Sequence, residues 1–346
     1  MIMHSEAPAG PADGSEHDVV VVGASAGGVE ALRALVAGLP PDLRATVLVV
    51  LHLPREAPSA LPAILDRAGP LPARHAIDGE EMRYGHVYIA PVDHHLLVLD
   101  GRMRLSRGPS ENGHRPAIDP LFRTAARSYG PRVVGIVLSG SRDDGADGAA
   151  VVARHGGVTI VQDPTEALYG SMPLAAMRMT RVDHVLPVGK IGPLLGELGT
   201  QPVTDQPVRL PPDRMVPAEV DAVVESADGS ASSPDTYGCP TCGGGLVEIQ
   251  SEPVPRYRCR VGHVWSPDSL LEEHTAALES ALWMALRALE EKSDLSAKLS
   301  VGGRDRGDLR TARTYQSLSD EARRASTLIR EVIARLGSGD GGMDVE

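Results

Sequence analysis

Short β-branched runs alternate with helix-like stretches over residues 18–199, and this alternation constrains the fold more than any other feature of the chain. Such a pattern is typical of a parallel sheet, because each connecting helix covers a face of the sheet. We therefore predict an α/β fold with a doubly wound, mostly parallel sheet, and a hairpin of residues 96–100 and 103–106 that turns through Asp100-Gly101. The predicted strands are residues 18–23, 46–51, 86–90, 133–138, 157–162 and 184–187, and the predicted helices are residues 29–39, 57–68, 120–129, 145–155 and 171–180.

The composition excludes several classes of protein. The 34 Lys and Arg against 46 Asp and Glu give a formal net charge of -12, and a nucleic-acid protein needs a basic face instead. No apolar run approaches the ~18 residues of a membrane span, so we expect no membrane insertion. The N-terminus lacks a basic-then-apolar signal pattern, and all three cysteines follow residue 238. These features argue against a secreted disulfide framework and predict a cytoplasmic protein.

Changes of composition along the chain predict six segments. The α/β pattern ends near residue 199, and a stretch rich in Pro, Asp, Ser and Val follows it. All the cysteines then occur in one short segment, and two amphipathic stretches follow. The predicted segments are a disordered N-terminus at 1–16, a catalytic domain at 17–199, a linker at 200–236, a small metal-binding module at 237–266, a helical hairpin at 267–337 and a disordered tail at 338–346.

The turn after the first strand is the most informative loop. A valine-rich strand runs into Gly-Ala-Ser-Ala-Gly-Gly at residues 23–28, and a helix begins at once. In an open α/β sheet this edge binds ligands, so Ser25 is placed to act as a nucleophile. The alternative is a phosphate or dinucleotide loop, because Gly23, Ser25 and Gly28 occupy the G-x-G-x-x-G positions with Ser in the middle.

The residue after the second strand favours the interpretation of Ser25 as a nucleophile over the dinucleotide loop. A dinucleotide site typically has an acidic residue at the end of this strand to bind the ribose, whereas here the strand is followed by His52. A histidine supplies the base that a serine hydroxyl needs, and a carboxylate after another inner strand would orient the imidazole. Asp143, Asp144 and Asp147 all follow the strand at 133–138. Helix capping and dipole compensation are the alternative roles for these three acids.

Six motifs in order resemble the catalytic domain of CheB-type protein-glutamate methylesterases. The resemblance covers residues 18–199 and is carried by 23–28 (GASAGG), 51–54 (LHLP), 85–91 (GHVYIAP), 115–122 (RPAIDPLF), 138–146 (LSGSRDDGA) and 169–173 (YGSMP). It implies a serine hydrolase with Ser25 as nucleophile, His52 as base and Asp144 as orienting carboxylate, and with no cofactor for catalysis. The implied substrates are glutamate methyl esters on the cytoplasmic domains of chemoreceptors or related signalling proteins, in chemosensory adaptation, and some members also deamidate glutamines.

The sequence departs from the family pattern in three places. Ser141-Arg142 stand where the family usually has Met-Gly, Ala26 replaces a frequent Thr, and the receiver domain that typically precedes this domain is missing. In the family, the backbone of the 141–142 region helps to form the oxyanion hole. The bulky, charged side chain of Arg142 would narrow the cleft or change its electrostatic potential. The alternative function is therefore a non-catalytic or altered-specificity signalling protein that binds a protein partner in the same cleft. A third hypothesis for the function is a nucleotide-binding oxidoreductase.

The cysteine-rich segment has the spacing of a zinc site. Cys239 and Cys242 form C-x2-C, and Cys259 and His263 form C-x3-H sixteen residues further on. Three thiolates and an imidazole suit a structural zinc in a small ribbon, which would supply the folding energy of a segment too small for its own core. The alternative is a redox pair, because Cys-Pro-x-Cys also occurs in thiol oxidoreductases.

The last two amphipathic stretches predict a helical hairpin. Ser266, Pro267 and Asp268 form a helix start, with a capping hydroxyl, a proline in the first turn and an acid near the dipole. One hairpin buries little apolar surface, so we expect a homodimer through these helices or a docking surface for a partner. The predicted apolar stripes are Leu271, His274, Leu278, Ala281, Leu282, Ala285 and Leu289, and then Tyr315, Leu318, Ala322, Ala325, Ile329, Val332 and Leu336.

Overall fold

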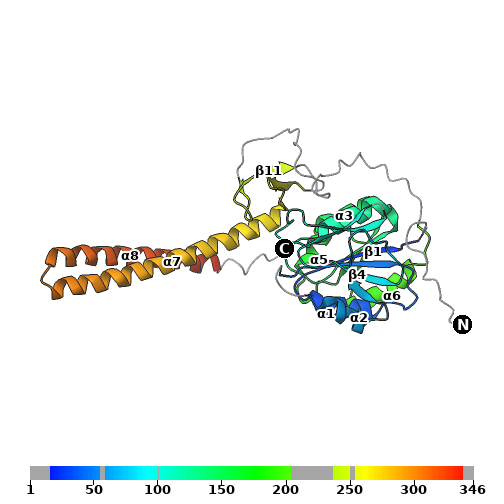
Figure 1. Ribbon diagram of the computed structural model, residues 1–346, viewed down its shortest axis with the longest axis horizontal. Helices are drawn as coiled ribbons and strands as arrows, with labels where there is room; N and C mark the ends of the chain where they lie inside the picture. The colour runs from blue at the N-terminus through cyan, green and yellow to red at the C-terminus, as the bar shows by residue number, and fades with distance from the viewer. Residues whose placement is uncertain (1–15, 55–58, 100, 204–236, 250–253, 338–346) are drawn as a thin grey trace. The chain divides into compact units, whose positions relative to one another are not determined.

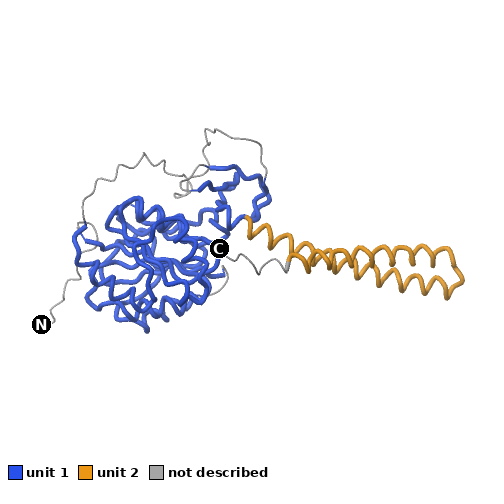
Figure 2. The backbone as a smooth tube through the Cα atoms, turned by 180° about the vertical axis from the view of Figure 1, so that it is seen from behind, with its two compact units in different colours: residues 1–270 blue, residues 271–346 orange. Residues whose placement is uncertain are grey.

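The structure, a computed structural model, describes residues 16–54, 59–99, 101–203, 237–249 and 254–337. The chain divides into two compact units, residues 1–270 and 271–346 (Figure 2). The first unit holds the α/β domain and the cysteine-rich module, and the second holds most of the two long helices. The predicted disordered ends and most of the predicted linker lie outside the described residues, although Glu16 and Pro202 are described and form an isolated β-bridge.

A seven-stranded parallel sheet is the centre of the first unit. Its order is β3-β4-β2-β1-β7-β8-β9, and β1 pairs with β2 on one side and β7 on the other. Strand order therefore reverses direction between β1 and β7, which makes their carboxyl ends the switch point of the sheet. The strands are β1 (Val19–Ala24), β2 (Thr46–Leu51), β3 (Ala73–His75), β4 (His86–Ile89), β7 (Val133–Val137), β8 (Val158–Gln162) and β9 (His184–Leu186).

Helices cover both faces of this sheet, so the strands can be apolar throughout. Every residue of β1, β2 and β7 is buried, as the runs of Val, Ile and Leu require. One core contains α1 (Gly28–Ala37), α2 (Leu61–Ala68) and α6 (Val188–Leu198), which lie below the sheet in Figure 1. The opposite core contains α3 (Ile118–Tyr129), α4 (Ala146–Arg154), α5 (Ser171–Met179) and the hairpin of β5 (His95–Leu99) and β6 (Arg102–Ser106).

The predicted α/β class is confirmed, and the six predicted strands and five predicted helices are present within a few residues of their expected bounds. The strand β3 and the helix α6 of the α/β domain were missed. The strand β3 has only three residues, too few to show a period. The helix α6 contains Pro193 and three glycines, which are helix-breaking residues, yet its apolar face packs on the sheet beside α1. The predicted turn at Asp100 lies outside the described residues.

The cysteine-rich segment folds as a small antiparallel sheet. Its strands β10 (Tyr237–Gly238), β11 (Gly245–Ile249), β12 (Arg256–Cys259) and β13 (Val264–Trp265) are in sequence order. We call residues 237–266 the Cys/His module. Its core is small and consists of Cys239, Leu246, Cys259 and Trp265, together with Leu270 from the helix that follows.

Two long helices follow, α7 (Pro267–Asp305) and α8 (Leu309–Gly337), connected through Gly307 at φ 75°. Hydrogen bonds between the Ser293 and Ser319 side chains and from Ser300 to the Ala312 carbonyl show that they run antiparallel side by side. The predicted hairpin is thus present, with α7 extending beyond residue 299. No helix among the described residues combines the length and the apolar character that a bilayer crossing needs.

Candidate active site

The Ser25 loop connects β1 to α1 at the switch point of the sheet. Gly27 adopts a left-handed φ of 70° immediately before α1, a conformation that glycine accepts without strain. A Cβ at Gly28 would lie 2.8 Å from the side chains of Ala24 and Leu51, so the helix start can approach the strands only with glycine there. The Ser25 N–H donates to the Ser139 carbonyl at 3.0 Å, which ties this loop to the one after β7.

His52 lies directly beside Ser25 because β2 is the parallel neighbour of β1. The His52 N–H donates to the Ala24 carbonyl at 3.1 Å, and its ring Nδ1 lies 3.1 Å from Ser25 Oγ. Its Nε2 lies 2.7 Å from Asp144 Oδ2. An ionised carboxylate only accepts hydrogen bonds, so Nε2 carries the proton and the Nδ1 lone pair faces the serine. This is the arrangement that a general base for a serine hydroxyl requires.

Asp144 is the carboxylate that reaches the imidazole. Its side chain is 1% exposed and accepts hydrogen bonds from His52 and from the Ile118 N–H at 2.7 Å. Asn112 Nδ2 donates to its other oxygen at 3.3 Å. Burial alone would raise the pKa of Asp144, but the hydrogen bond from His52 and the positive potential of His52 outweigh it and hold the pKa below its usual value. Asp144 is therefore charged at neutral pH.

The other two acids of this loop have different partners. Asp143 accepts a hydrogen bond from the Ser269 hydroxyl, and Asp147 forms an ion pair with Arg256 at 3.1 Å. None of the three acids caps α4 with its side chain. That role belongs to Asp119, whose Oδ1 accepts from the N–H groups of Gly145 and Gly148 at 2.9 and 2.8 Å. The three acids therefore have different partners, and Asp144, the one that the family resemblance implies, is the one that contacts His52.

Two residues near the site were not singled out from the sequence, Asn112 and His114. They belong to a tight turn in which Glu111 and His114 exchange backbone hydrogen bonds, with Asn112 at φ 49° and Gly113 at φ 80°. The Asn-Gly dipeptide is the typical signal for such a turn. The His114 ring stacks on His52 with centroids 3.6 Å apart. Burial, with the neighbouring His52 and Arg142, lowers the pKa of His114 to about 3.

The loop that departs from the family motif passes alongside the serine. A Cβ at Gly140 would lie 2.9 Å from the Ser25 Cβ, so the two backbones are in close contact. Arg142 has a left-handed φ of 67°, which is uncommon for a residue with a side chain. The glycine that the motif usually carries at this position would adopt this conformation without strain.

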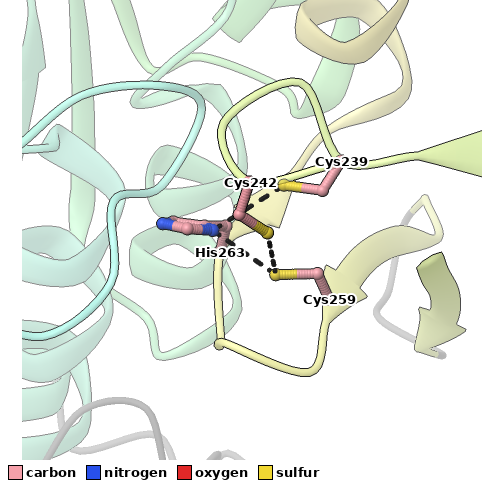
Figure 3. A group of neighbouring side chains, drawn as sticks. All are labelled: Cys239, Cys242, Cys259 and His263. Carbon is pink, nitrogen blue, oxygen red and sulfur yellow. Dashed lines mark hydrogen bonds between the residues drawn. The ribbon is translucent and has the colours of Figure 1, made fainter. Parts of the chain in front are cut away.

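The four predicted metal ligands also come together. The candidate ligand atoms of Cys239, Cys242, Cys259 and His263 all lie within 4.8 Å of one another (Figure 3). The Sγ atoms of Cys242 and Cys259 are 3.6 Å apart, and His263 Nδ1 is 3.4 Å from Cys259 Sγ. All three cysteines are free thiols. Four converging atoms of this kind form the donor set that zinc accepts in small structural sites.

The fold is a doubly wound parallel sheet, and a serine, a histidine and an aspartate are hydrogen-bonded in series at its switch point. This combination is typical of α/β hydrolytic enzymes. A family model described as CheB methylesterase matches residues 20–195, which are 176 of the 346 residues. The chain therefore belongs to the CheB methylesterase family. This match replaces the dinucleotide-loop interpretation of residues 23–28.

Curated relatives match over the same part of the chain. One from Anaeromyxobacter dehalogenans is 43% identical over 191 residues, which are 55% of this chain and 56% of the relative. One from Caulobacter vibrioides is 40% identical over 196 residues, 55% of each chain. Both are named protein-glutamate methylesterase/protein-glutamine glutaminase 2. The chain spans about half the length of the curated relatives it matches.

A solved structure matches as well. The crystal structure of the Thermotoga maritima CheB methylesterase catalytic domain aligns with a TM-score of 0.50 and 34% sequence identity. The alignment covers 98% of that chain and 52% of this one. The shared part is therefore a whole catalytic domain, and the Cys/His module and the long helices are additional to it.

Proposed function

We propose that this protein hydrolyses methyl esters of glutamate side chains on the cytoplasmic domains of chemoreceptors or related signalling proteins, and so takes part in chemosensory adaptation. The continuous path of hydrogen bonds from Ser25 through His52 to Asp144 carries the proposal. Membership of the CheB methylesterase family and the names of the curated relatives support the choice of substrate. Those names also make deamidation of receptor glutamines a second reaction of the same site. A cytoplasmic location is part of the proposal.

In this proposal each of the three side chains has one role. Ser25 Oγ attacks the ester carbonyl while His52 Nδ1 takes the hydroxyl proton, and Asp144 stabilises the imidazolium that forms. The imidazolium then gives the proton to the departing methoxide, which leaves as methanol. Water, activated by the same imidazole, hydrolyses the acyl-serine and releases glutamate. The reaction needs no cofactor, because every proton moves between Ser25, His52, the leaving group and water.

The negative oxygen of the tetrahedral intermediate needs hydrogen-bond donors. The loop of residues 140–142 passes alongside Ser25, and the Ser25 loop leads into the N-terminus of α1. We expect backbone N–H groups of these segments to stabilise this oxygen, and a backbone donor survives the change of side chain at Ser141 and Arg142. Arg142 then adds positive charge at the rim of the site.

The experiment for this function is methanol release. The full chain is incubated with membranes that carry methyl-labelled receptors, and volatile label is counted over time. We expect the wild-type protein to release methanol and Ser25→Ala to lose the activity by at least about 10³-fold, since the nucleophile is gone. His184→Ala, a half-exposed histidine on β9, is the matched control and should keep the activity. Release by Ser25→Ala at the wild-type rate would refute the proposal.

A second function is favoured by one observation, the left-handed backbone of Arg142 in the loop that passes alongside Ser25. In this alternative the cleft binds a protein partner without hydrolysing it, or acts on a different ester. Absence of methanol release from methylated receptors and from small glutamate methyl esters, together with retained receptor binding, would support it. Methanol release by the wild-type protein would exclude the non-catalytic form.

We also propose that the Cys/His module holds one structural zinc ion through Cys239, Cys242, Cys259 and His263. The donor set and its convergence support zinc, and the small core of the module gives the metal a folding role. A redox pair is the alternative for Cys239 and Cys242. Metal analysis of the purified full chain should give about one zinc per chain, falling in Cys259→Ser. A disulfide between Cys239 and Cys242 with no bound metal would favour the redox alternative.

Association through the long helices stays a prediction. Leu271 and Leu278, at the start of the stripe predicted for α7, are exposed, whereas Leu286 is buried. Light scattering coupled to size exclusion measures the mass directly. A mass of two chains would support the homodimer, and a single-chain mass at all concentrations, alone and with receptor domains, would contradict both the dimer and the docking surface.

A further inference from the structure

The Cys/His module contacts the turn that supports the catalytic carboxylate. The Asn112 N–H donates to the Val264 carbonyl at 2.8 Å, and the Val264 N–H donates to the Ser110 carbonyl at 3.2 Å. The strand β13 therefore pairs with residues 110–112 of the α/β domain. Trp265 lies buried against Gly113, where an added Cβ would come within 3.3 Å of its ring. The two parts of the first unit meet through backbone pairing and close packing.

Asn112 connects this contact to the candidate catalytic residues. Its side chain is buried, and its Oδ1 accepts the Ser266 N–H at 2.9 Å. Its Nδ2 donates to Asp144 Oδ1 at 3.3 Å. One amide group therefore links the last residue of the module to the carboxylate that orients His52. In the same region the Ser269 hydroxyl, in the first turn of α7, donates to Asp143, the residue before Asp144.

Arg256 makes a second connection from β12. Its guanidinium is buried and donates to Asp147 Oδ2 and to Asp119 Oδ2, both at 3.1 Å. Asp119 in turn accepts the N–H of Gly145, the residue directly after Asp144. Glu111 belongs to the same buried group and is 3.4 Å from Arg256.

The charge of this group depends on the module. Three buried carboxylates, Glu111, Asp119 and Asp147, face two arginines, and one of these, Arg123, comes from the α/β domain itself. Without Arg256 the three carboxylates would face one arginine, and buried carboxylates repel each other strongly when they are not paired. The turn from Asp144 to Gly148 would then lose the partner that holds Asp119 in place.

We infer that Asn112 and Arg256 are positioning residues that make the orientation of Asp144, and so the activity of Ser25 and His52, depend on the Cys/His module. This inference rests on the proposed function for its kinetic consequence and on geometry alone for its structural one. Asn112 fixes one oxygen of Asp144 from the side of the module, and Arg256 fixes the turn on which Asp144 lies. The module is in this sense a part of the active site rather than an independent appendage.

The test compares three variants of the full chain. Asn112→Asp keeps the size, the left-handed backbone preference and the acceptor for Ser266, but it replaces the donor to Asp144 by a carboxylate oxygen that repels it. Arg256→Lys keeps the charge but loses the planar fork that spans Asp119 and Asp147. Arg260→Lys changes an exposed arginine in the turn after β12 and is the matched control. Each variant is first checked for its melting temperature and its zinc content.

Two readouts distinguish positioning from a general loss of structure. We expect kcat for methanol release to fall about 10- to 100-fold in Asn112→Asp and Arg256→Lys with KM unchanged, because a displaced base costs rate rather than binding. The second readout is the low-field proton resonance of the His52 Nε2–H that bonds Asp144, assigned by its loss in Asp144→Asn. It should shift or broaden in both variants and stay unchanged in Arg260→Lys.

The outcomes are separable. Wild-type kcat and an unchanged resonance in folded Asn112→Asp and Arg256→Lys would overturn the inference. A lower kcat that accompanies a lower melting temperature, with the resonance unchanged, would also overturn it, since the effect would then be general destabilisation. If the wild-type protein released no methanol, the proposed function would fail, and the resonance would still decide whether the module positions Asp144. If one variant does not fold, the other carries both readouts.

Discussion

The α/β domain and the helical hairpin bury their side chains in opposite ways. In β1 and β2 every residue is buried and nearly all are large and apolar. Between α7 and α8 the buried positions include Ser293, Ser300 and Ser319, while large apolar residues such as Leu328 are exposed. A closed apolar core fixes the strands, and hence the residues at their ends, to within fractions of an ångström. The hairpin instead leaves part of its apolar surface exposed, for example at Leu271, Leu278 and Leu328.

The proposed catalytic residues all lie in the first region, and His52→Gln is expected to have the largest effect on the activity. Removing the base leaves the serine hydroxyl without a proton acceptor, so kcat for methanol release should fall about 10⁶-fold. His184→Gln, on an outer strand, serves as the control and should change kcat less than tenfold. A His52→Gln variant that keeps a tenth of the activity would show that the base lies elsewhere.

A matched pair of leucines tests the difference in packing. Leu32 on α1 is fully buried, and Leu328 on α8 is 63% exposed. Leu32→Ala should lower the free energy of unfolding by about 2–5 kcal/mol through lost burial and a cavity. Leu328→Ala should change it by less than about 0.5 kcal/mol. Urea unfolding followed by circular dichroism measures both, and equal losses would mean that the hairpin face is already covered in solution.

The turn that carries His114 gives the α/β domain a specific sensitivity to acid. The pKa of His114 falls from 6.5 to about 3 on folding, chiefly because the ring is buried and also because Arg142 is nearby. Between pH 6.5 and pH 3 the unfolded chain therefore binds a proton at His114 that the folded chain does not bind. The contribution of His114 to the free energy of unfolding thus decreases as the pH falls from 6.5 to 3. His114→Asn should lose less stability than the wild-type protein between pH 6.5 and pH 4.

Urea unfolding at several pH values measures this difference, with His184→Asn as the control. Groups remote from His114 titrate equally in the wild-type protein and the variant, so the difference between them reports His114 and its direct neighbours. Identical pH profiles for the wild-type protein and His114→Asn would contradict the buried, neutral state of His114.

The smallest effect is expected at Arg142. A residue with a side chain at φ 67° carries backbone strain that glycine avoids, although glycine loses more chain entropy on folding. Arg142→Gly should therefore raise the free energy of unfolding by about 0.5 kcal/mol. The melting temperature measures it, and a decrease would show that contacts of the arginine outweigh the strain.

The sequence alone predicts the α/β domain well because its signals are local. Valine runs mark the strands, and the Gly-rich turn and the histidine after β2 lie at strand ends that a parallel sheet must bring together. The strand pattern alone could not choose among Asp143, Asp144 and Asp147, although the family resemblance implied Asp144. The choice depends on which side chains approach from distant segments, namely His52, Arg256 and Ser269.

The contact between the Cys/His module and the turn at Asn112 could not be predicted from the sequence either. The spacing of the cysteines predicts a metal site, but it contains no information on what the module packs against. The Asn-Gly dipeptide at 112–113 was a readable turn signal, whereas its contacts with Ser266 and Asp144 join residues up to 154 positions apart. Such contacts follow from the packing of whole elements.

The most direct test of the account is the rate of methanol release by Asp144→Asn compared with Asp143→Asn. An asparagine at 144 keeps the shape but no longer holds the imidazole with its lone pair toward Ser25, so the rate should fall about 10⁴-fold. Asp143→Asn, whose side chain contacts Ser269 rather than His52, should keep the rate within about tenfold. A rate for Asp144→Asn within tenfold of the wild-type value would contradict the assignment of Ser25, His52 and Asp144 as one catalytic unit.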